Sequence, residues 1–161
     1  MNSNTIGVLN YSTSNSSSVV SCLEAIETKY IIADKFDELT NCKKIIIPGV
    51  GNINNFSQNN PLIILKKQIL DYVNKGGFIY GICLGMQLFL DKSEEGSSKG
   101  LGLISGEVIS LKSHFGMELN VGHKKILLNN NSIITNNLFK GIDSNASFYF
   151  LHKFFCANIS E

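Results

Sequence analysis

The first ninety residues alternate between short apolar runs and longer segments in which apolar residues recur at helical spacing. The apolar runs predict buried strands at residues 6–11, 30–33, 44–47 and 78–83. The helical spacing predicts helices from Ser18, with preceding serines as N-caps, between Pro61 and Lys75, and from Leu84 to Leu90. Strands that alternate with helices form right-handed βαβ units. We therefore expect an α/β fold with a mostly parallel sheet covered by helices on both faces.

The second half has a different pattern. Apolar runs predict strands at residues 101–111, 125–128 and 148–155, separated by Gly, Asn and Ser loops, with one short helical piece around Leu138. We find no internal repeat and no linker long enough to divide the chain. Residues 1–161 are therefore expected to form a single domain.

Composition narrows the functional classes. The chain has 161 residues, of which 43% are hydrophobic and 17% charged, as in one globular domain. Its net charge is +1, and all 14 basic residues are lysines. Without arginine, no guanidinium group can make a bidentate contact to a phosphate or a guanine, so we expect no nucleic-acid partner. With no signal-peptide pattern and no apolar run of membrane-spanning length, we expect a cytoplasmic protein that does not bind membranes.

The four cysteines, Cys22, Cys42, Cys83 and Cys156, have neither zinc-ligand nor redox-motif spacing. Only Cys83 has an informative neighbourhood, because it lies between Gly81 and Gly85 in a G-x-C-x-G segment where a predicted strand meets a predicted helix. Such a sharp turn lifts a nucleophile out of the sheet, and a helix N-terminus favours its thiolate. From the pattern alone, a nucleophile and an ordinary buried cysteine at a strand end are equally compatible with this segment.

Three motifs together resemble those of the class I (triad) glutamine amidotransferases, and within them most closely the glutaminase subunits of imidazole glycerol phosphate synthase. The motifs are G-I-C-L-G-M-Q at residues 81–87, P-G-V-G at residues 48–51, and S-E-E-G at residues 93–96 followed by G-L-G-L-I at residues 100–104. Further matches in the same order extend the resemblance from about Ile6 to about Phe155. The resemblance implies a flavodoxin-like, mostly parallel sheet.

The resemblance also implies a role for each matching residue. Cys83 would be the nucleophile that attacks the side-chain amide of glutamine. The oxyanion would be stabilised by backbone N–H groups of the loop Gly49, Val50 and Gly51, together with that of Leu84. Gln87 and Glu95 would hold the glutamine, Glu95 by attracting its ammonium group. No metal or other cofactor is implied.

Two of these segments also have plainer interpretations. Residues 48–51 would form an ordinary turn at a strand end, and Glu94 with Glu95 would be a solvated surface pair.

The sequence departs from the family where the family faces its synthase subunit. The family's first loop usually reads Asp-Tyr-Gly-x-Gly-Asn, whereas residues 10–15 read Asn-Tyr-Ser-Thr-Ser-Asn. His123 and Lys124 replace a usual Trp-Asn pair, and Lys153 and Phe154 replace a usual Ser-Tyr. The first two departures concern the partner, whereas the third lies where the family presents backbone groups to glutamine.

The family's catalytic His-Pro-Glu segment is absent from residues 1–161. In the family this segment supplies the base and the acid that orients it, a few tens of residues beyond the position of His152. The three histidines, His114, His123 and His152, are not followed by Pro-Glu. We therefore expect a domain apparently truncated at its C-terminus, without its last strands and without its catalytic pair, which leaves apolar backbone uncovered.

The resemblance implies a glutaminase that hydrolyses glutamine to glutamate and ammonia. It would deliver the ammonia to a (βα)8-barrel synthase subunit, in a heterodimer that serves histidine biosynthesis. Two alternatives stay open: a diverged paralogue that supplies ammonia for amidination of a surface sugar, and a non-catalytic remnant. The fold and the motifs make two further predictions. Residues 48–51 and Cys83 are neighbours at the carboxyl ends of the strands, and Cys83 is the most reactive of the four thiols.

Overall fold

The structure, a computed structural model, describes residues 1–11, 14–54, 62–127, 137–143 and 145–160. It forms two compact units. The first unit consists of Met1–Ser110 and Phe154–Glu161, and the second of Leu111–Lys153. The units are described separately below.

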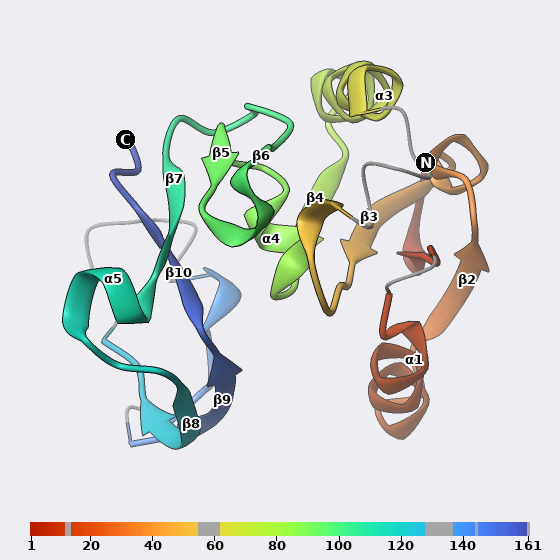
Figure 1. Cartoon of the computed structure of the whole chain (residues 1–161). Coiled ribbons are helices and arrows are strands. Elements are labelled where there is room, and N and C mark those ends of the chain that lie inside the picture. Colours follow the sequence, from red (N-terminus) through yellow and green to blue (C-terminus); the bar gives the residue numbers. More distant parts are fainter. Residues whose placement is uncertain (12–13, 55–61, 128–136, 144, 161) are drawn as a thin grey trace. The chain divides into compact units, whose positions relative to one another are not determined.

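The first unit contains the predicted parallel sheet (Figure 1). Its strands are β1 (Asn2–Leu9), β2 (Lys29–Ala33), β3 (Cys42–Ile47) and β4 (Phe78–Gly81), in the spatial order β2-β1-β3-β4. The chain thus adds β2 on one side of β1 and β3 on the other. In open α/β sheets, the crevice at such a reversal is where ligands bind, at the carboxyl ends of the strands. The α/β fold and this edge are therefore as predicted.

One face of this sheet contributes to the main core. Ile45 and Ile47 of β3 are buried together with residues of the helix α3 (Leu62–Asn74) and of the short helix η1 (Phe36–Leu39). Tyr72 of α3 donates a hydrogen bond from its hydroxyl to the Cys42 carbonyl oxygen at 3.0 Å. This bond ties α3 to the sheet.

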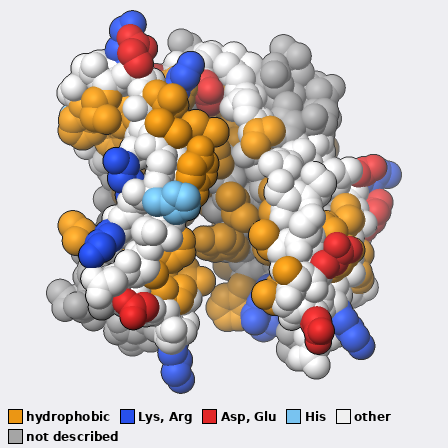
Figure 2. All heavy atoms as spheres, turned by 90° about the horizontal axis from the view of Figure 1, so that it is seen from below, with side chains coloured by type: hydrophobic (Ala, Val, Ile, Leu, Met, Phe, Trp, Pro, Cys, Tyr) orange, Lys and Arg blue, Asp and Glu red, His pale blue; other side chains and the backbone are white. Residues whose placement is uncertain are grey.

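The helix α1 (Ser16–Ala25) contacts β1 and β2 and buries Leu23. Phe78 and Tyr80 of the edge strand β4 are exposed. Figure 2 shows hydrophobic side chains in patches between polar ones on the visible surface. A parallel sheet is ordinarily covered on both faces.

A second, mixed sheet completes the first unit. Its strands follow the short helix α4 (Leu84–Gln87) in the chain. They are β5 (Lys92–Ser93), β6 (Ser98–Lys99), β7 (Glu107–Ser110) and β10 (Phe154–Ala157), in the spatial order β10-β7-β5-β6. The short helix η2 (Glu95–Ser97) lies between β5 and β6 in the chain.

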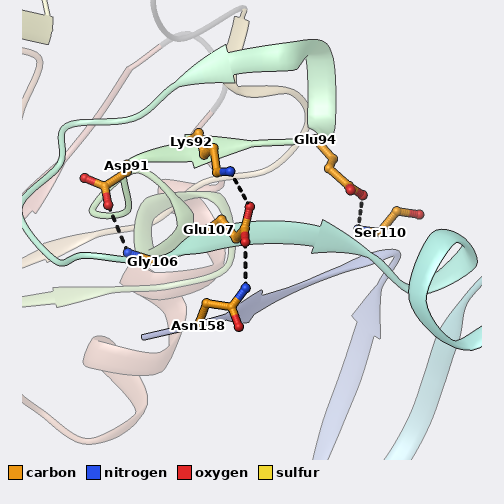
Figure 3. A network of polar contacts seen from close by, with 7 residues as sticks. All are labelled: Asp91, Lys92, Glu94, Gly106, Glu107, Ser110 and Asn158. Carbon is orange, nitrogen blue, oxygen red and sulfur yellow. Dashed lines mark hydrogen bonds and ion pairs between the residues drawn. The ribbon is translucent and has the colours of Figure 1, made fainter. Parts of the chain in front are cut away.

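Polar side chains link these short strands (Figure 3). Lys92 forms an ion pair with Glu107 at 2.8 Å, and the Asn158 side chain donates to Glu107 at 2.6 Å. The Asp91 carboxylate accepts from the Gly106 amide at 3.0 Å, and Glu94 accepts from the Ser110 amide at 2.7 Å. The network holds β7 to β5 and to the segment after β10.

The second unit contains the helix α5 (Leu111–Phe115) and an antiparallel pair, β8 (Asn120–Lys125) with β9 (Ser147–His152). Opposite each other in register, Asn120 and His152 are joined through their side chains at 2.8 Å.

Several predicted boundaries were wrong. The residue at the N-cap of α1 is Asn15 rather than a serine, and the helix predicted to reach Leu90 ends at Gln87. The strand predicted at 101–111 is confined to β7, because the backbone turns at Gly102 (φ 56°) and Gly106 (φ 153°).

The remaining strands of the second half were also misplaced. In place of the strand predicted at 125–128 the structure has β8, which ends at Lys125. The strand predicted at 148–155 is split at Lys153 into β9 and β10. Residues 137–138 are helical, in agreement with the piece predicted around Leu138. Pro61 and Leu128 lie outside the described residues. None of the helices in the described part of the chain has the length and hydropathy needed to span a membrane.

Replacing Ile45, which is 1% exposed in the centre of the sheet, tests the core. We expect Ile45→Ala to lower the free energy of unfolding by about 2–5 kcal/mol, because it leaves a cavity between β3 and its neighbours. Ile63→Ala is the matched control, since Ile63 is 86% exposed on α3, and we expect a change within about 0.5 kcal/mol. Urea denaturation measures both, and equal effects would contradict the assignment of the core.

Candidate active site

Cys83 lies at a sharp turn between β4 and α4. Its backbone is at φ 53° and ψ −113°, a conformation that costs a non-glycine residue on the order of 1–3 kcal/mol. Glycine on either side makes the turn possible. A Cβ on Gly81 would lie 2.6 Å from the Met86 backbone, and a Cβ on Gly85 would overlap the Ile47 carbonyl oxygen. The structure thus forms the turn predicted from the G-x-C-x-G pattern.

The loop of residues 48–51 lies directly beside this turn, as predicted. The Ile82 amide donates to the Ile47 carbonyl oxygen at 3.0 Å, and the Leu84 amide donates to the Gly49 carbonyl oxygen at 3.4 Å. A Cβ added to Gly49 would lie 2.8 Å from the Leu84 Cβ. The backbone of this loop therefore approaches the start of α4 as closely as glycine allows.

The conformation of this loop places a carbonyl, not an amide, against Leu84. The Leu84 N–H, expected to help stabilise an oxyanion, is used by the Gly49 carbonyl in a long hydrogen bond. Nearby, Val50 is exposed and Gly51, at φ 87°, has open space where a side chain would lie. The peptide between Gly49 and Val50 therefore has space on the solvent side to reorient.

The expected stabilisation of the Cys83 thiolate is wrong for this structure. Desolvation by the surrounding protein raises the pKa of the Cys83 thiol above its ordinary value, and the negative charge of Glu95 raises it further. A hydrogen bond from the Leu84 backbone opposes these effects without overcoming them. Since α4 has only 4 residues, few peptide dipoles add up at its N-terminus. Both effects, burial and the Glu95 charge, disfavour the thiolate relative to that of an ordinary cysteine.

Gln87 and Glu95, the two predicted glutamine ligands, are both partly withdrawn from solvent. Gln87 is 6% exposed, and its Oε1 atom has no hydrogen-bond partner among the described residues. An orphaned buried acceptor costs about 1–3 kcal/mol, which a donor from a ligand would recover. Burial raises the pKa of the Glu95 carboxyl, whose charge acts on Cys83.

Of Glu94 and Glu95, only Glu94 is exposed, as a residue of a solvated surface pair would be. The Glu94 side chain holds the Ser110 amide in the mixed sheet, as Figure 3 shows, whereas Glu95 is half-buried and interacts electrostatically with Cys83.

Two residues near Cys83 had no predicted role. Tyr11, which follows β1, is buried and donates a hydrogen bond from its hydroxyl to the Pro48 carbonyl oxygen. Burial raises the pKa of the Tyr11 phenol, and the charge of Cys83 raises it further. Burial and the charge of Cys83 also raise the pKa of the half-buried Cys156. The loop motif already contained Tyr11, but its partner Pro48 is distant in sequence.

The other cysteines and the histidines add little to this site. Cys22, in α1, is exposed. All three histidines, His114, His123 and His152, belong to the second unit. Among the described residues, no three His, Cys, Asp or Glu side chains come together so as to hold a metal ion.

The profile of the family described as glutamine amidotransferase class-I matches residues 7–161. The chain belongs to this family. Two solved structures have the same fold. One is a crystal structure of a glutamine amidotransferase, with a TM-score of 0.61 and 16% identity over 92% of this chain and 70% of that one. The other is the structure of PurLQS from Thermotoga maritima, with a TM-score of 0.60 and 18% identity over 95% of this chain and 68% of that one.

Closer similarity in sequence is found to proteins named imidazole glycerol phosphate synthase subunit HisH. The protein from Bacillus subtilis is 33% identical over 162 residues, covering 97% of this chain and 74% of that protein. The one from Methanocaldococcus jannaschii is 37% identical over 156 residues, covering 92% and 72%. The one from Chlorobium luteolum is 33% identical over 150 residues, covering 92% and 73%. The chain thus spans about three quarters of the length of these relatives.

The pH dependence of Cys83 alkylation tests the electrostatics of the site. We expect its midpoint to lie above the ordinary thiol pKa of about 8.5, because burial and Glu95 both disfavour the thiolate. Glu95→Gln removes a negative charge, so it lowers the midpoint and speeds alkylation at pH 7. Iodoacetamide labelling read by peptide mass spectrometry gives the rate at each cysteine.

Glu94→Gln is the matched control, because the Glu94 carboxylate is bonded to the Ser110 amide instead. We expect its profile at Cys83 to equal that of the wild type. The interaction assigned to Glu95 and Cys83 would be contradicted if Glu95→Gln left the midpoint of Cys83 alkylation unchanged. It would also be contradicted if both variants lowered this midpoint equally.

Proposed function

We propose that this chain is the glutaminase subunit of an imidazole glycerol phosphate synthase. It hydrolyses L-glutamine in the cytoplasm and delivers the ammonia to a (βα)8-barrel synthase subunit, within a heterodimer that serves histidine biosynthesis. The observation that carries the proposal is the juxtaposition of Cys83, at the turn into α4, with the loop of residues 48–51. The similarity to proteins named HisH supports the choice of this pathway.

The proposed reaction begins at the sulfur of Cys83. The thiolate attacks the side-chain amide carbon of glutamine, and a tetrahedral intermediate forms with negative charge on its oxygen. The intermediate collapses to a glutamyl thioester as the amide nitrogen takes up a proton and leaves as ammonia. Water then attacks the thioester, which releases glutamate and restores the thiol.

Glutamine binding is assigned to the two side chains withdrawn from solvent. The unpartnered Oε1 atom of Gln87 is an acceptor for an N–H of the substrate. The Glu95 carboxylate is the counter-charge for the substrate's ammonium group, which would also offset its effect on the Cys83 thiol. Glutamine binding would therefore lower the pKa of the Cys83 thiol.

The oxyanion requires a change in the loop of residues 48–51. Its N–H donors have to point at the developing charge, whereas here the Gly49 carbonyl accepts from the Leu84 amide. A turn of the Gly49–Val50 peptide would present the Val50 N–H and free the Leu84 N–H at the same time. The open surroundings of Gly51 leave space for this movement.

General acid–base catalysis is the part that residues 1–161 do not supply. None of the three histidines, His114, His123 and His152, is followed by Pro-Glu. A positioned base and acid contribute about 10²–10⁴-fold to such a reaction. We propose that activity depends on a further segment with His-Pro-Glu, in the same polypeptide or in a second one.

Glutaminase assays with and without such a segment test this proposal. We expect residues 1–161 to produce no measurable glutamate from glutamine, even with a synthase subunit and its ligand present. Adding a C-terminal segment that contains His-Pro-Glu, fused or as a separate polypeptide, should give glutamate production. Cys83→Ala should abolish it, and Cys22→Ala, the control at an exposed cysteine, should leave it unchanged.

Two outcomes contradict parts of the proposal. Strong Cys83-dependent activity from residues 1–161 alone would mean that the base lies within them, and His152 and His123 would be tested first. A completed, folded protein that binds the synthase subunit but stays inactive would identify a non-catalytic remnant.

A further inference from the structure

We propose that the Tyr11 hydroxyl positions the loop of residues 48–51 for glutamine hydrolysis, by fixing the Pro48 carbonyl as the pivot about which the Gly49–Val50 peptide turns. Tyr11 would be a positioning residue, since its partner is the loop and not the substrate. The inference rests on the proposed function of this loop. It begins from the hydrogen bond between the buried Tyr11 hydroxyl and the Pro48 carbonyl oxygen.

The topology of the sheet brings these residues together. Tyr11 follows β1, Pro48 follows β3 and Leu84 follows β4, and these three strands are neighbours in the sheet. Gly49 lies where the three strand ends meet. A Cβ on Gly49 would overlap the Tyr11 hydroxyl on one side and lie 2.9 Å from the Gly85 nitrogen on another. The loop is thus confined between Tyr11 and the start of α4.

Hydrogen bonds within its own loop fix Tyr11. The Tyr11 amide donates to Ser14 Oγ at 3.1 Å, and the Ser14 amide donates to the Tyr11 carbonyl oxygen at 2.8 Å. The neighbouring Asn10 accepts from the Ser14 and Ser16 hydroxyls at 3.1 and 2.7 Å and donates to Asp34 at 2.7 Å. The Tyr11 backbone is therefore tied to the start of α1 and to the end of β2.

Two successive carbonyls of the loop thus have different partners. The Pro48 carbonyl is held by a side chain, whereas the bond that the Gly49 carbonyl accepts within the described part of the chain is the long one of 3.4 Å from the Leu84 amide. Breaking the weaker bond lets the Gly49–Val50 peptide turn while Pro48 stays in place. Because the pKa of the Tyr11 phenol is raised, the hydroxyl remains a donor throughout the neutral pH range.

Tyr11→Phe removes the donor and keeps the ring, and Tyr72→Phe is the matched control. The Tyr72 hydroxyl also donates to a carbonyl oxygen in the same core, that of Cys42, but away from Cys83. Hydrogen exchange of single backbone amides, followed by NMR on the full chain without glutamine, is the measurement. Both variants are expected to lose stability, so global unfolding is measured in parallel by urea denaturation.

We expect Tyr11→Phe to speed hydrogen exchange at the Leu84 amide by about 5- to 150-fold more than the change in global unfolding explains. This factor corresponds to the free-energy cost of leaving a buried carbonyl, here that of Pro48, without its hydrogen-bond donor. Tyr72→Phe should change the Leu84 amide only as far as global stability falls. A Leu84 amide that follows global stability in both variants would overturn the inference, since Tyr11 would then be merely structural.

Ser14→Ala keeps the test decisive if Tyr11→Phe does not fold. It removes one hydrogen bond that holds the Tyr11 backbone, and we expect a smaller increase of exchange confined to the Leu84, Val50 and Gly51 amides. No local increase in Ser14→Ala would then overturn the inference. The measurement needs neither substrate nor turnover, so an inactive glutaminase would refute the proposed function without affecting this result.

Discussion

The close approach of Gly49 to the start of α4 is the constraint on which the site depends. A side chain at this position would collide with the Tyr11 hydroxyl, the Leu84 side chain and the Gly85 backbone. Gly49 follows β3, and these groups follow β1 and β4, the strands on either side of it, so the sheet itself sets their separation. The strained backbone of Cys83 is held between Gly81 and Gly85 in the same place. Fold and candidate chemistry are therefore specified by the same few contacts.

The first four strands and the turn at Cys83 were predicted from short stretches of sequence, because such stretches determine them. The strands β1 to β4 and the turn at Cys83 were found because apolar runs and glycine spacing are local signals. Strand positions after residue 100 were predicted poorly. There, glycines such as Gly102 and Gly106 at positive φ turn the backbone within apolar runs, and the periodicity gives no sign of it.

The electrostatics of the site depend on contacts between distant residues, which a single sequence does not contain. The neighbouring residues Glu94 and Glu95 have different surroundings, one bonded to the Ser110 amide and the other half-buried near Cys83. The pattern of a nucleophile before a helix suggested a stabilised thiolate. Burial and the Glu95 charge reverse that expectation, and both arise only once the chain is folded. Family resemblance supplied the residues, but not their protonation.

We propose one site for glutamine, formed by Cys83, the loop of residues 48–51, Gln87 and Glu95. Protection of Cys83 from iodoacetamide by L-glutamine tests it most directly, with D-glutamine as the control ligand and Cys22, exposed on α1, as the control thiol. We expect saturating L-glutamine to slow alkylation of Cys83 at least about tenfold, because the site is then mostly occupied. D-glutamine should have no effect on Cys83, and the alkylation of Cys22 should be unchanged. Equal alkylation of Cys83 with and without L-glutamine would contradict the assignment of this site to glutamine.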